Sequence, residues 1–101
     1  MKPNVSMMLA GAAEVDITPA IGTAMVGALV PRFSEGIDDP LMAKALVLES
    51  GPLRMAVVAL DLATLPRRWG DACVSAAAAK TGIPPEHIVW CATHTHTGPI
   101  A

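Results

Sequence analysis

The chain has 101 residues, of which 52% are hydrophobic, 16% charged and 3% aromatic, and its formal net charge is −2. This length allows one domain or part of one, and the composition excludes a disordered chain and indicates that the chain needs more cover than it carries. The near-neutral charge and the scarcity of aromatic side chains argue against a nucleic-acid-binding surface.

The first residues carry no clear export signal. The apolar run at 7–13 is short and contains Gly11, which makes a poor signal-peptide core. No run approaches the roughly 20 apolar residues that a transmembrane segment needs. We treat residues 1–9 as an N-terminal lead-in. A short strand is predicted near 12–17, and the glycines and prolines between it and residue 31 predict irregular, turn-rich backbone.

Two strand-like segments follow, at 41–49 and 54–61, and Ser50-Gly51-Pro52 separates them. A β-hairpin is the simplest connection between them. The second segment contains a continuous apolar run at 55–60, which is typical of a strand that is covered on both faces. We therefore expect it to be central in its sheet.

A helix is predicted next, with Thr64 as its N-cap and Gly82 in the left-handed conformation at its end. The apolar stripe of this helix is predicted at Leu65, Trp69, Ala72, Cys73 and Ala76. Another apolar strand follows at 87–92, so the order strand, helix, strand predicts a parallel βαβ unit. The predicted fold is an α/β partial domain, a mixed sheet with a β-hairpin and a βαβ unit.

Cys73 and Cys91 both lie in apolar stretches and do not form a pattern typical of a disulfide framework. We expect them to be small buried hydrophobic side chains.

His94 and His96 form an H-x-H pair just after the last predicted strand. In an extended strand, residues two apart point to the same face, so both imidazoles can reach one side of the sheet. Neutral imidazole suits Zn²⁺, but a catalytic zinc site normally has three protein ligands. Asp61 follows the neighbouring parallel strand, and the carboxyl edge of such a sheet is where ligands bind.

Four segments together resemble the neutral/alkaline non-lysosomal ceramidase family. They are GAAEVDITP at 11–19 with Gly22, RFSEGIDDPLMAKALVL at 32–48, ALDL at 59–62 and ATHTHTGP at 92–99. Each motif alone is weak, but the four occur in the family's order at similar intervals. The resemblance runs from about residue 10 to the end of the chain, which identifies residues 10–101 as a truncated, amino-terminal segment of a neutral ceramidase-like catalytic domain.

The resemblance implies a zinc-dependent amidohydrolase that cleaves the N-acyl bond of ceramide to sphingosine and a fatty acid. It assigns His94 as a zinc ligand and His96 as the catalytic acid/base or transition-state partner. The family's other ligands are a distant histidine, a glutamate and a tyrosine. Because this chain contains no tyrosine, the resemblance implies a fragment that is inactive alone. Family members are often secreted or membrane-associated, and the sequence leaves the compartment and the oligomeric state open.

Other side chains of these motifs have structural alternatives. The segments 16–19 and 38–40 fit turns, because aspartate satisfies local backbone donors. Many family members have histidine where Asp38 stands, and Thr97 replaces the more usual serine. Asp61 could hold an imidazole through its free ring nitrogen or cap the following helix. We expect His87 to be structural, and Arg32 and Ser34 to pack a turn or to contact substrate.

Two further functions stay open at this stage. One is a non-catalytic module that binds a divalent metal or a partner through uncovered apolar faces. The other is a family hydrolase that acts on a different amide or ester. A tight one-to-one zinc site in this chain would favour the first of these.

Overall fold

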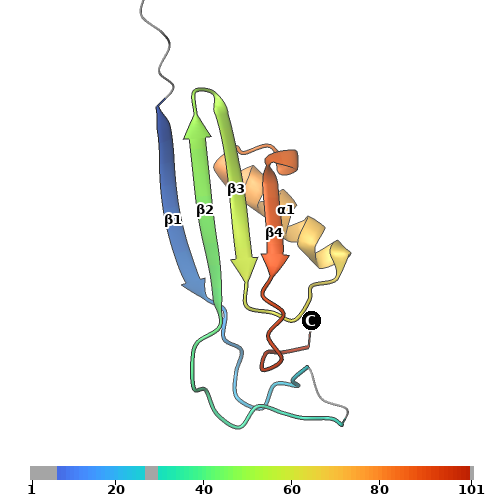
Figure 1. The fold of residues 1–101 in the computed structure, drawn as a ribbon. Coiled ribbons are helices and arrows are strands. Elements are labelled where there is room, and N and C mark those ends of the chain that lie inside the picture. The colour runs from blue at the N-terminus through green and yellow to red at the C-terminus, as the bar shows by residue number, and fades with distance from the viewer. Residues whose placement is uncertain (1–6, 27–29, 101) are drawn as a thin grey trace, which may run out of the picture.

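A computed structural model describes residues 7–26 and 30–100, and it contains one mixed four-stranded sheet with one helix (Figure 1). The strands lie in the order β1-β2-β3-β4, with the first two pairings antiparallel and the last parallel. This is the predicted α/β class. The elements are β1 (Met8–Asp16), β2 (Met42–Ser50), β3 (Leu53–Leu60), α1 (Arg67–Thr81), the 3₁₀ helix η1 (Pro85–His87) and β4 (Ile88–Ala92).

The predicted hairpin is confirmed. β2 and β3 pair from Ser50 opposite Leu53 to Ala43 opposite Leu60, and Gly51 turns the chain with a φ of 57°. Glycine reaches this left-handed conformation without the steric cost that a Cβ would impose. β1 pairs with the other side of β2 and starts at Met8, earlier than predicted, so it takes in the last two residues of the lead-in.

The predicted βαβ unit is also confirmed, since β3 and β4 are parallel and α1 connects them. Gly82 ends the helix with a φ of 74°, and its N–H donates to the carbonyl of Ala78 at 2.9 Å. The predicted N-cap is wrong. Pro66 takes that position in extended conformation, and its carbonyl accepts from the N–H groups of Trp69 and Gly70.

The helix packs on the sheet through a different face from the predicted stripe. Its only buried residue is Gly70, whereas Trp69 is 53% exposed. A Cβ built on Gly70 would lie 2.6 Å from the Trp90 ring, so the missing side chain is what lets the helix approach β4. The half-buried helix residues lie on the same face as Gly70, at Val74, Ala77 and Ala78.

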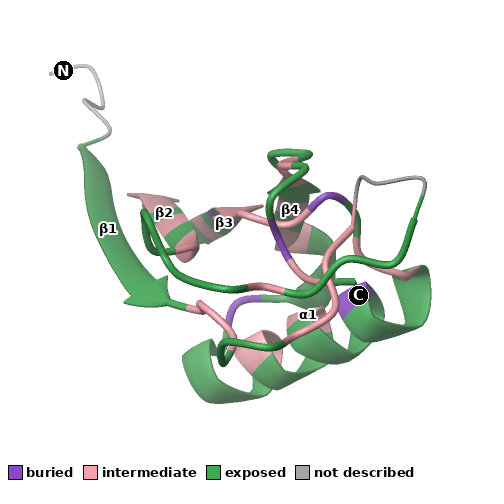
Figure 2. Cartoon of the chain, turned by 90° about the horizontal axis from the view of Figure 1, so that it is seen from below, coloured by how far each residue is buried: buried purple, intermediate pink, exposed green. Residues whose placement is uncertain are grey.

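The helix lies over the β3–β4 side of one face of the sheet, every residue of β1 is exposed, and the other face of the sheet stays open (Figure 1). Figure 2 shows how little of the chain is buried, and the buried hydrophobic residues among those described are Ala56, Ala63 and Ile83. β3 is central in the strand order, as predicted, but it is not covered on both faces, because Met55 is 39% and Val57 36% exposed.

Both thiols are free and exposed, which contradicts the prediction that they are buried. Cys73 belongs to the outward face of α1, because the helix is rotated away from the predicted stripe. Cys91 pairs with Ala59 in register, two residues along from Val57, and therefore lies on the open face of the sheet.

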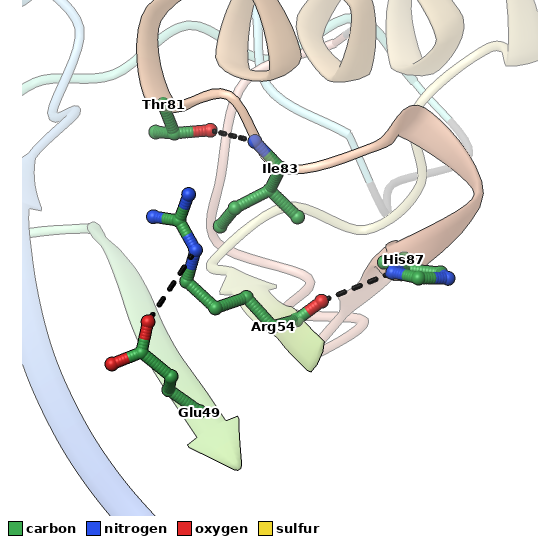
Figure 3. Close-up of polar contacts among 5 residues, drawn as sticks. All are labelled: Glu49, Arg54, Thr81, Ile83 and His87. Atoms are coloured by element: carbon green, nitrogen blue, oxygen red, sulfur yellow. Dashed lines mark hydrogen bonds and ion pairs between the residues drawn. The ribbon is translucent and has the colours of Figure 1, made fainter. Parts of the chain in front are cut away.

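The end of the sheet away from Asp61 is held by polar contacts (Figure 3). His87 Nδ1 lies 3.1 Å from the carbonyl oxygen of Arg54, and the Arg54 guanidinium lies 3.6 Å from the carboxylate of Glu49. The N–H of the buried Ile83 donates to the Thr81 hydroxyl at 3.2 Å. His87 therefore has the structural role that the sequence predicts. Within the described residues, no helix has the length and apolar character needed to cross a bilayer.

Candidate functional site

The segments that follow β3 and β4 run together past the carboxyl edge of the sheet, at the lower end of Figure 1. The N–H of Thr93 donates to the Leu60 carbonyl at 2.9 Å, and the N–H of His94 donates to the Leu62 carbonyl at 2.9 Å. Asp61 and His94 therefore come to the same edge of the sheet, as the sequence predicts.

The His94 imidazole is oriented by one backbone carbonyl. Its Nδ1 lies 2.8 Å from the carbonyl oxygen of Ala63. Because a carbonyl only accepts, a neutral His94 ring that makes this bond has its proton on Nδ1 and its lone pair on Nε2. Metal-binding histidines commonly have this arrangement, in which the second ring nitrogen donates to a carbonyl or carboxylate. Sequence patterns contain no signal for the Ala63 carbonyl, because every residue has one.

The His96 ring lies beside the His94 ring, with centroids 4.9 Å apart and planes at 73°. The predicted reason for this proximity is wrong, because β4 ends at Ala92 and the pair is not extended. His94 has a φ of 64°, in the left-handed region, and this turn brings the two rings together. Both histidine residues are exposed.

Asp61 neither holds an imidazole nor caps the helix. Its carboxylate accepts from the N–H of Met42 at 2.9 Å and from the Thr93 hydroxyl at 3.2 Å. These bonds join the start of β2 to the ends of β3 and β4. Asp61 does not hold the His94 ring, because the Ala63 carbonyl is already hydrogen-bonded to Nδ1. It does not cap the helix, because the helix begins several residues later, after Pro66.

The loop between β1 and β2 packs against the chain that follows the histidine pair. Met25 and Pro99 form an antiparallel bridge, Val26 N–H donates to the Gly98 carbonyl and Ile100 N–H to the Ala24 carbonyl, both at 3.0 Å. Segment 24–26 in turn pairs with segment 32–34. Segments 32–34, 24–26 and 98–100 therefore lie side by side as a small irregular sheet of isolated β-bridges, apart from the four main strands. Residues 93–97, which we call the histidine loop, lead directly into it.

Arg32 and Ser34 have turn-packing contacts, as the first of the two predicted roles requires. The Ser34 hydroxyl accepts from the N–H of Gly22 at 2.9 Å. The Arg32 guanidinium donates to the Val26 carbonyl at 3.1 Å and to the His96 carbonyl at 2.7 Å.

The turn predicted at 16–19 is confirmed. The Asp16 carboxylate accepts from the N–H of Thr18 at 2.7 Å, and the Thr18 hydroxyl accepts from the N–H of Leu41 at 2.8 Å. Hydrogen bonds from the Thr18 side chain and backbone hold the pKa of Asp16 below its usual value. Asp38 and Asp39 form a bend, as predicted.

A cavity of about 490 Å³ opens beside the histidine loop. It is lined by hydroxyl and carboxylate side chains, among them Thr18, Ser34, Asp38, Asp61, Thr95 and Thr97, and by apolar ones that include Met25, Ile37 and Leu41. Thr95 and Thr97 flank His96 in the sequence, but neither histidine lines the cavity. Thr18, Thr95 and Thr97 could not be predicted as lining residues, because single threonines carry no sequence pattern.

Within residues 7–26 and 30–100, no three histidine, cysteine, aspartate or glutamate side chains come together as a metal site would require. The donor chemistry that this edge offers to a metal is that of the two neighbouring imidazoles. For one of them, His94, the Ala63 carbonyl favours the neutral tautomer that leaves Nε2 available.

The fold is similar to that of two solved ceramidase structures. Neutral ceramidase from Pseudomonas aeruginosa matches with a TM-score of 0.82 and 28% identity over 96% of this chain, and a structure described as "Ceramidase complexed with C2" matches with 0.79 and 29% over 92%. The chain covers 16% and 15% of those two proteins. No protein-family model and no curated protein matches it. The predicted resemblance is therefore confirmed, and the chain has the fold of a small part of a neutral ceramidase.

Proposed function

We propose that the chain is the amino-terminal segment of a zinc-dependent amidohydrolase that resembles neutral ceramidase. The observation that carries the proposal is the His94 ring, held through Nδ1 by the Ala63 carbonyl with Nε2 free, beside a second imidazole and in a ceramidase-like fold. His94 is the proposed metal ligand and His96 the proposed catalytic residue.

The two imidazoles at this edge can supply part of a zinc centre, because zinc accepts neutral imidazole and takes about three protein ligands. Zinc, when bound, lowers the pKa of a coordinated water to about 7 and polarises a carbonyl oxygen. His94 would hold it through Nε2, because the Ala63 carbonyl fixes the proton on Nδ1. The backbone bond from His94 N–H to the Leu62 carbonyl holds the same residue at a second point. The ligand therefore starts from one orientation, which lowers the entropic cost of binding.

His96 is proposed to serve the reaction by moving a proton. An imidazole is both an acid and a base near neutral pH, so it can take a proton from the attacking water and give one to the departing amine. Its ring lies 4.9 Å, centroid to centroid, from that of the proposed ligand. No hydrogen bond to the His96 ring occurs among the described residues, which leaves its nitrogens available to a reacting group.

We further propose a ceramide-like lipid amide as the substrate, with hydrolysis of its N-acyl bond. The cavity beside the histidine loop supports a substrate of mixed character, because hydroxyls and carboxylates line it together with Met25, Ile37 and Leu41. Thr95 and Thr97 join this cavity to the histidine pair. Polar groups of the substrate would be held by this wall close to His96.

The proposed enzyme needs more polypeptide than this chain supplies. The chain spans 16% of the length of the neutral ceramidase structure, and a catalytic zinc site takes about three protein ligands. We propose that the remaining ligands come from that further polypeptide and that it also covers the open face of the sheet. The chain alone is then expected to bind zinc weakly and to be inactive.

Zinc titration followed by NMR of the imidazole resonances tests the metal assignment. We expect the His94 resonances to shift in the wild-type chain and zinc binding to be lost in His94→Ala. His87→Ala is the matched control, because His87 lies at the far end of the sheet and should leave the titration unchanged. Resonances of His94 that stay in place at saturating zinc would overturn the assignment, and a tight one-to-one site would favour an independent metal-binding module.

The activity assignment needs a separate measurement. A fluorogenic ceramide should be turned over by a protein that comprises this segment and the remaining catalytic polypeptide, and not by the 101-residue chain. His96→Ala in the longer protein should lower kcat by about 10²- to 10⁴-fold, the usual contribution of a general acid or base. Turnover of ceramide by the purified short chain would contradict the fragment proposal.

A further inference from the structure

The two histidines of the pair are held by different parts of the chain. His94 is bonded through its N–H to Leu62 and through its ring to Ala63, both just after β3. His96 has a different partner, since its carbonyl accepts from Nη2 of Arg32 at 2.7 Å. Arg32 lies 64 residues earlier in the chain, in the loop between β1 and β2.

We propose that Arg32 is a positioning residue that fixes His96 against His94. Its importance for catalysis rests on the proposed function, whereas its effect on the geometry of the ring pair does not. Arg32 acts on His96 through the backbone, and the structure gives it no contact with a reacting group.

Arg32 joins two loops through its guanidinium, and we call this pair of hydrogen bonds the Arg32 clasp. Nη2 of Arg32 carries two hydrogens, and it reaches two carbonyl oxygens, that of Val26 at 3.1 Å and that of His96 at 2.7 Å. The guanidinium keeps its charge at every accessible pH, and hydrogen bonds from a charged donor are stronger than neutral ones.

The backbone of Arg32 is itself held by a hydrogen bond. The carbonyl of Arg32 accepts from Met25 N–H at 2.8 Å, inside the small irregular sheet. That sheet continues to the segment after the histidine loop through the bonds from Val26 to Gly98 and from Ile100 to Ala24. Removal of the guanidinium leaves all of these backbone bonds in place. The expected effect is therefore local to residues 95–97 and is not a loss of the fold.

The orientation of His96 depends on the hydrogen bond from Arg32, because few other contacts hold this residue. Among the described residues, its ring accepts and donates no hydrogen bond, and the residue is exposed. The 4.9 Å separation and 73° angle to His94 then depend on the left-handed turn at His94, on the backbone at residue 96 and on contact between the rings. Small displacements of a catalytic group cost large factors in rate, so a fixed His96 peptide matters to the proposed reaction.

NMR of the 101-residue chain at one fixed pH tests the proposal without metal or substrate. In wild type we expect an NOE between the His94 and His96 ring protons and ring-current shifts of both. Arg32→Ala should abolish the inter-ring NOE and move the His96 shifts toward free-imidazole values, while the Trp90 indole signal keeps its position. Arg32→Lys should restore part of the effect. Arg67→Ala, at another exposed arginine, which pairs with Asp71 on the same helix, is the matched control.

A measurement on the wild-type chain covers the case in which Arg32→Ala fails to fold. The clasp predicts separate, slowly exchanging Nη2 protons of Arg32 with a through-bond coupling to the His96 carbonyl carbon. A single averaged Nη signal in wild type, or ring NOEs unchanged in a folded Arg32→Ala, would overturn the proposal. In the longer, active protein, Arg32→Ala should lower kcat by about 10- to 100-fold with KM little changed. Failure of zinc binding would defeat the proposed function and leave the ring geometry test intact.

Discussion

At the scale of single residues, Gly70 decides how closely the helix meets the sheet. A Cβ at this position would lie 2.6 to 2.8 Å from three atoms of the Trp90 indole, which is well inside normal contact. We expect Gly70→Ala to lower the free energy of unfolding by about 1–3 kcal/mol through overpacking. The loss should appear even though alanine is the better helix former by about 1 kcal/mol. Equilibrium urea unfolding, followed by far-UV circular dichroism, measures it.

Gly36 provides the matched control for that substitution. A Cβ at Gly36 would meet nothing within 4 Å, and its backbone does not lie in the left-handed region. Gly36→Ala should therefore change the free energy of unfolding by less than about 0.5 kcal/mol. If the two substitutions have equal effects, packing against Trp90 is not the reason that glycine stands at position 70.

Asp16 is expected to make stability depend on pH at the acidic end. The Thr18 side chain and then its backbone N–H lower the pKa of the folded carboxyl below its unfolded value. The stabilisation is therefore complete above the unfolded pKa, about 3.9, and is lost as the pH falls through the lower folded pKa. Carboxyl carbon shifts should show Asp16 titrating below the ordinary range, and Thr18→Val should raise its pKa. Thr23→Val, a matched substitution away from this turn, should leave the Asp16 titration where it is.

Residue-level prediction succeeded where a residue type has a local geometric consequence. Gly82 ends the helix in a left-handed conformation, and Asp16 makes its turn with the residue two positions later. It failed where the partner is a backbone group. The Ala63 carbonyl that orients His94 and the His96 carbonyl that Arg32 holds have no side-chain signature.

At the scale of elements, the Asp61 carboxylate adds side-chain hydrogen bonds between strands at the carboxyl edge of the sheet, beyond those of the backbone. Its two oxygens accept from Met42 at the start of β2 and from Thr93 just after β4. We expect Asp61→Ala to leave the Met42 N–H without its partner and to cost about 1–3 kcal/mol, toward the lower end because the site is only part-buried. Hydrogen exchange at Met42 should be faster in this variant.

Substitution of Asp61 by asparagine distinguishes the loss of a hydrogen bond from the loss of side-chain volume. Asp61→Asn keeps one oxygen that can accept from Met42, so the exchange protection of that amide should survive. The Glu49 carboxylate, which pairs with Arg54 at the opposite end of the sheet, offers a control in Glu49→Ala. Unchanged Met42 exchange in Asp61→Ala would mean that β2 is held without this carboxylate.

The elements themselves were largely predictable, and their packing was not. The hairpin and the βαβ unit follow from chain-local signals, Ser50-Gly51-Pro52 and Gly82 with two prolines after it. The helix face could not be found from periodicity, because the alanines around residues 76–79 make several stripes equally apolar. The choice between them came from the fit of Gly70 to Trp90, two residues far apart in the sequence.

At the scale of the whole molecule, the apolar composition and the folded surface agree. Hydrophobic residues make up 52% of the chain, which is more than a fold of 101 residues can bury. Large hydrophobic side chains are indeed exposed on the face of the sheet away from α1. They include Leu46, Val57 and Val89, at 43%, 36% and 52% exposure, and these three are neighbours in register. A contiguous exposed apolar patch of this kind is typical of a surface that another polypeptide covers.

We therefore expect the isolated chain to self-associate through the open face of the sheet. Leu46→Lys should reduce association in sedimentation velocity across a concentration series, because Lys44 already places an exposed charge on this face. Val58→Lys, one residue along from Val57 and on the helix side, should instead destabilise the fold, because Val58 is half-buried beneath the helix and a charge there lacks a partner. Association that persists in Leu46→Lys would show that this patch is not the contact. If the charge removes association while the urea midpoint stays within the wild-type range, the open face contributes little to folding of the segment itself and is free to serve as the surface on which the rest of the proposed enzyme packs.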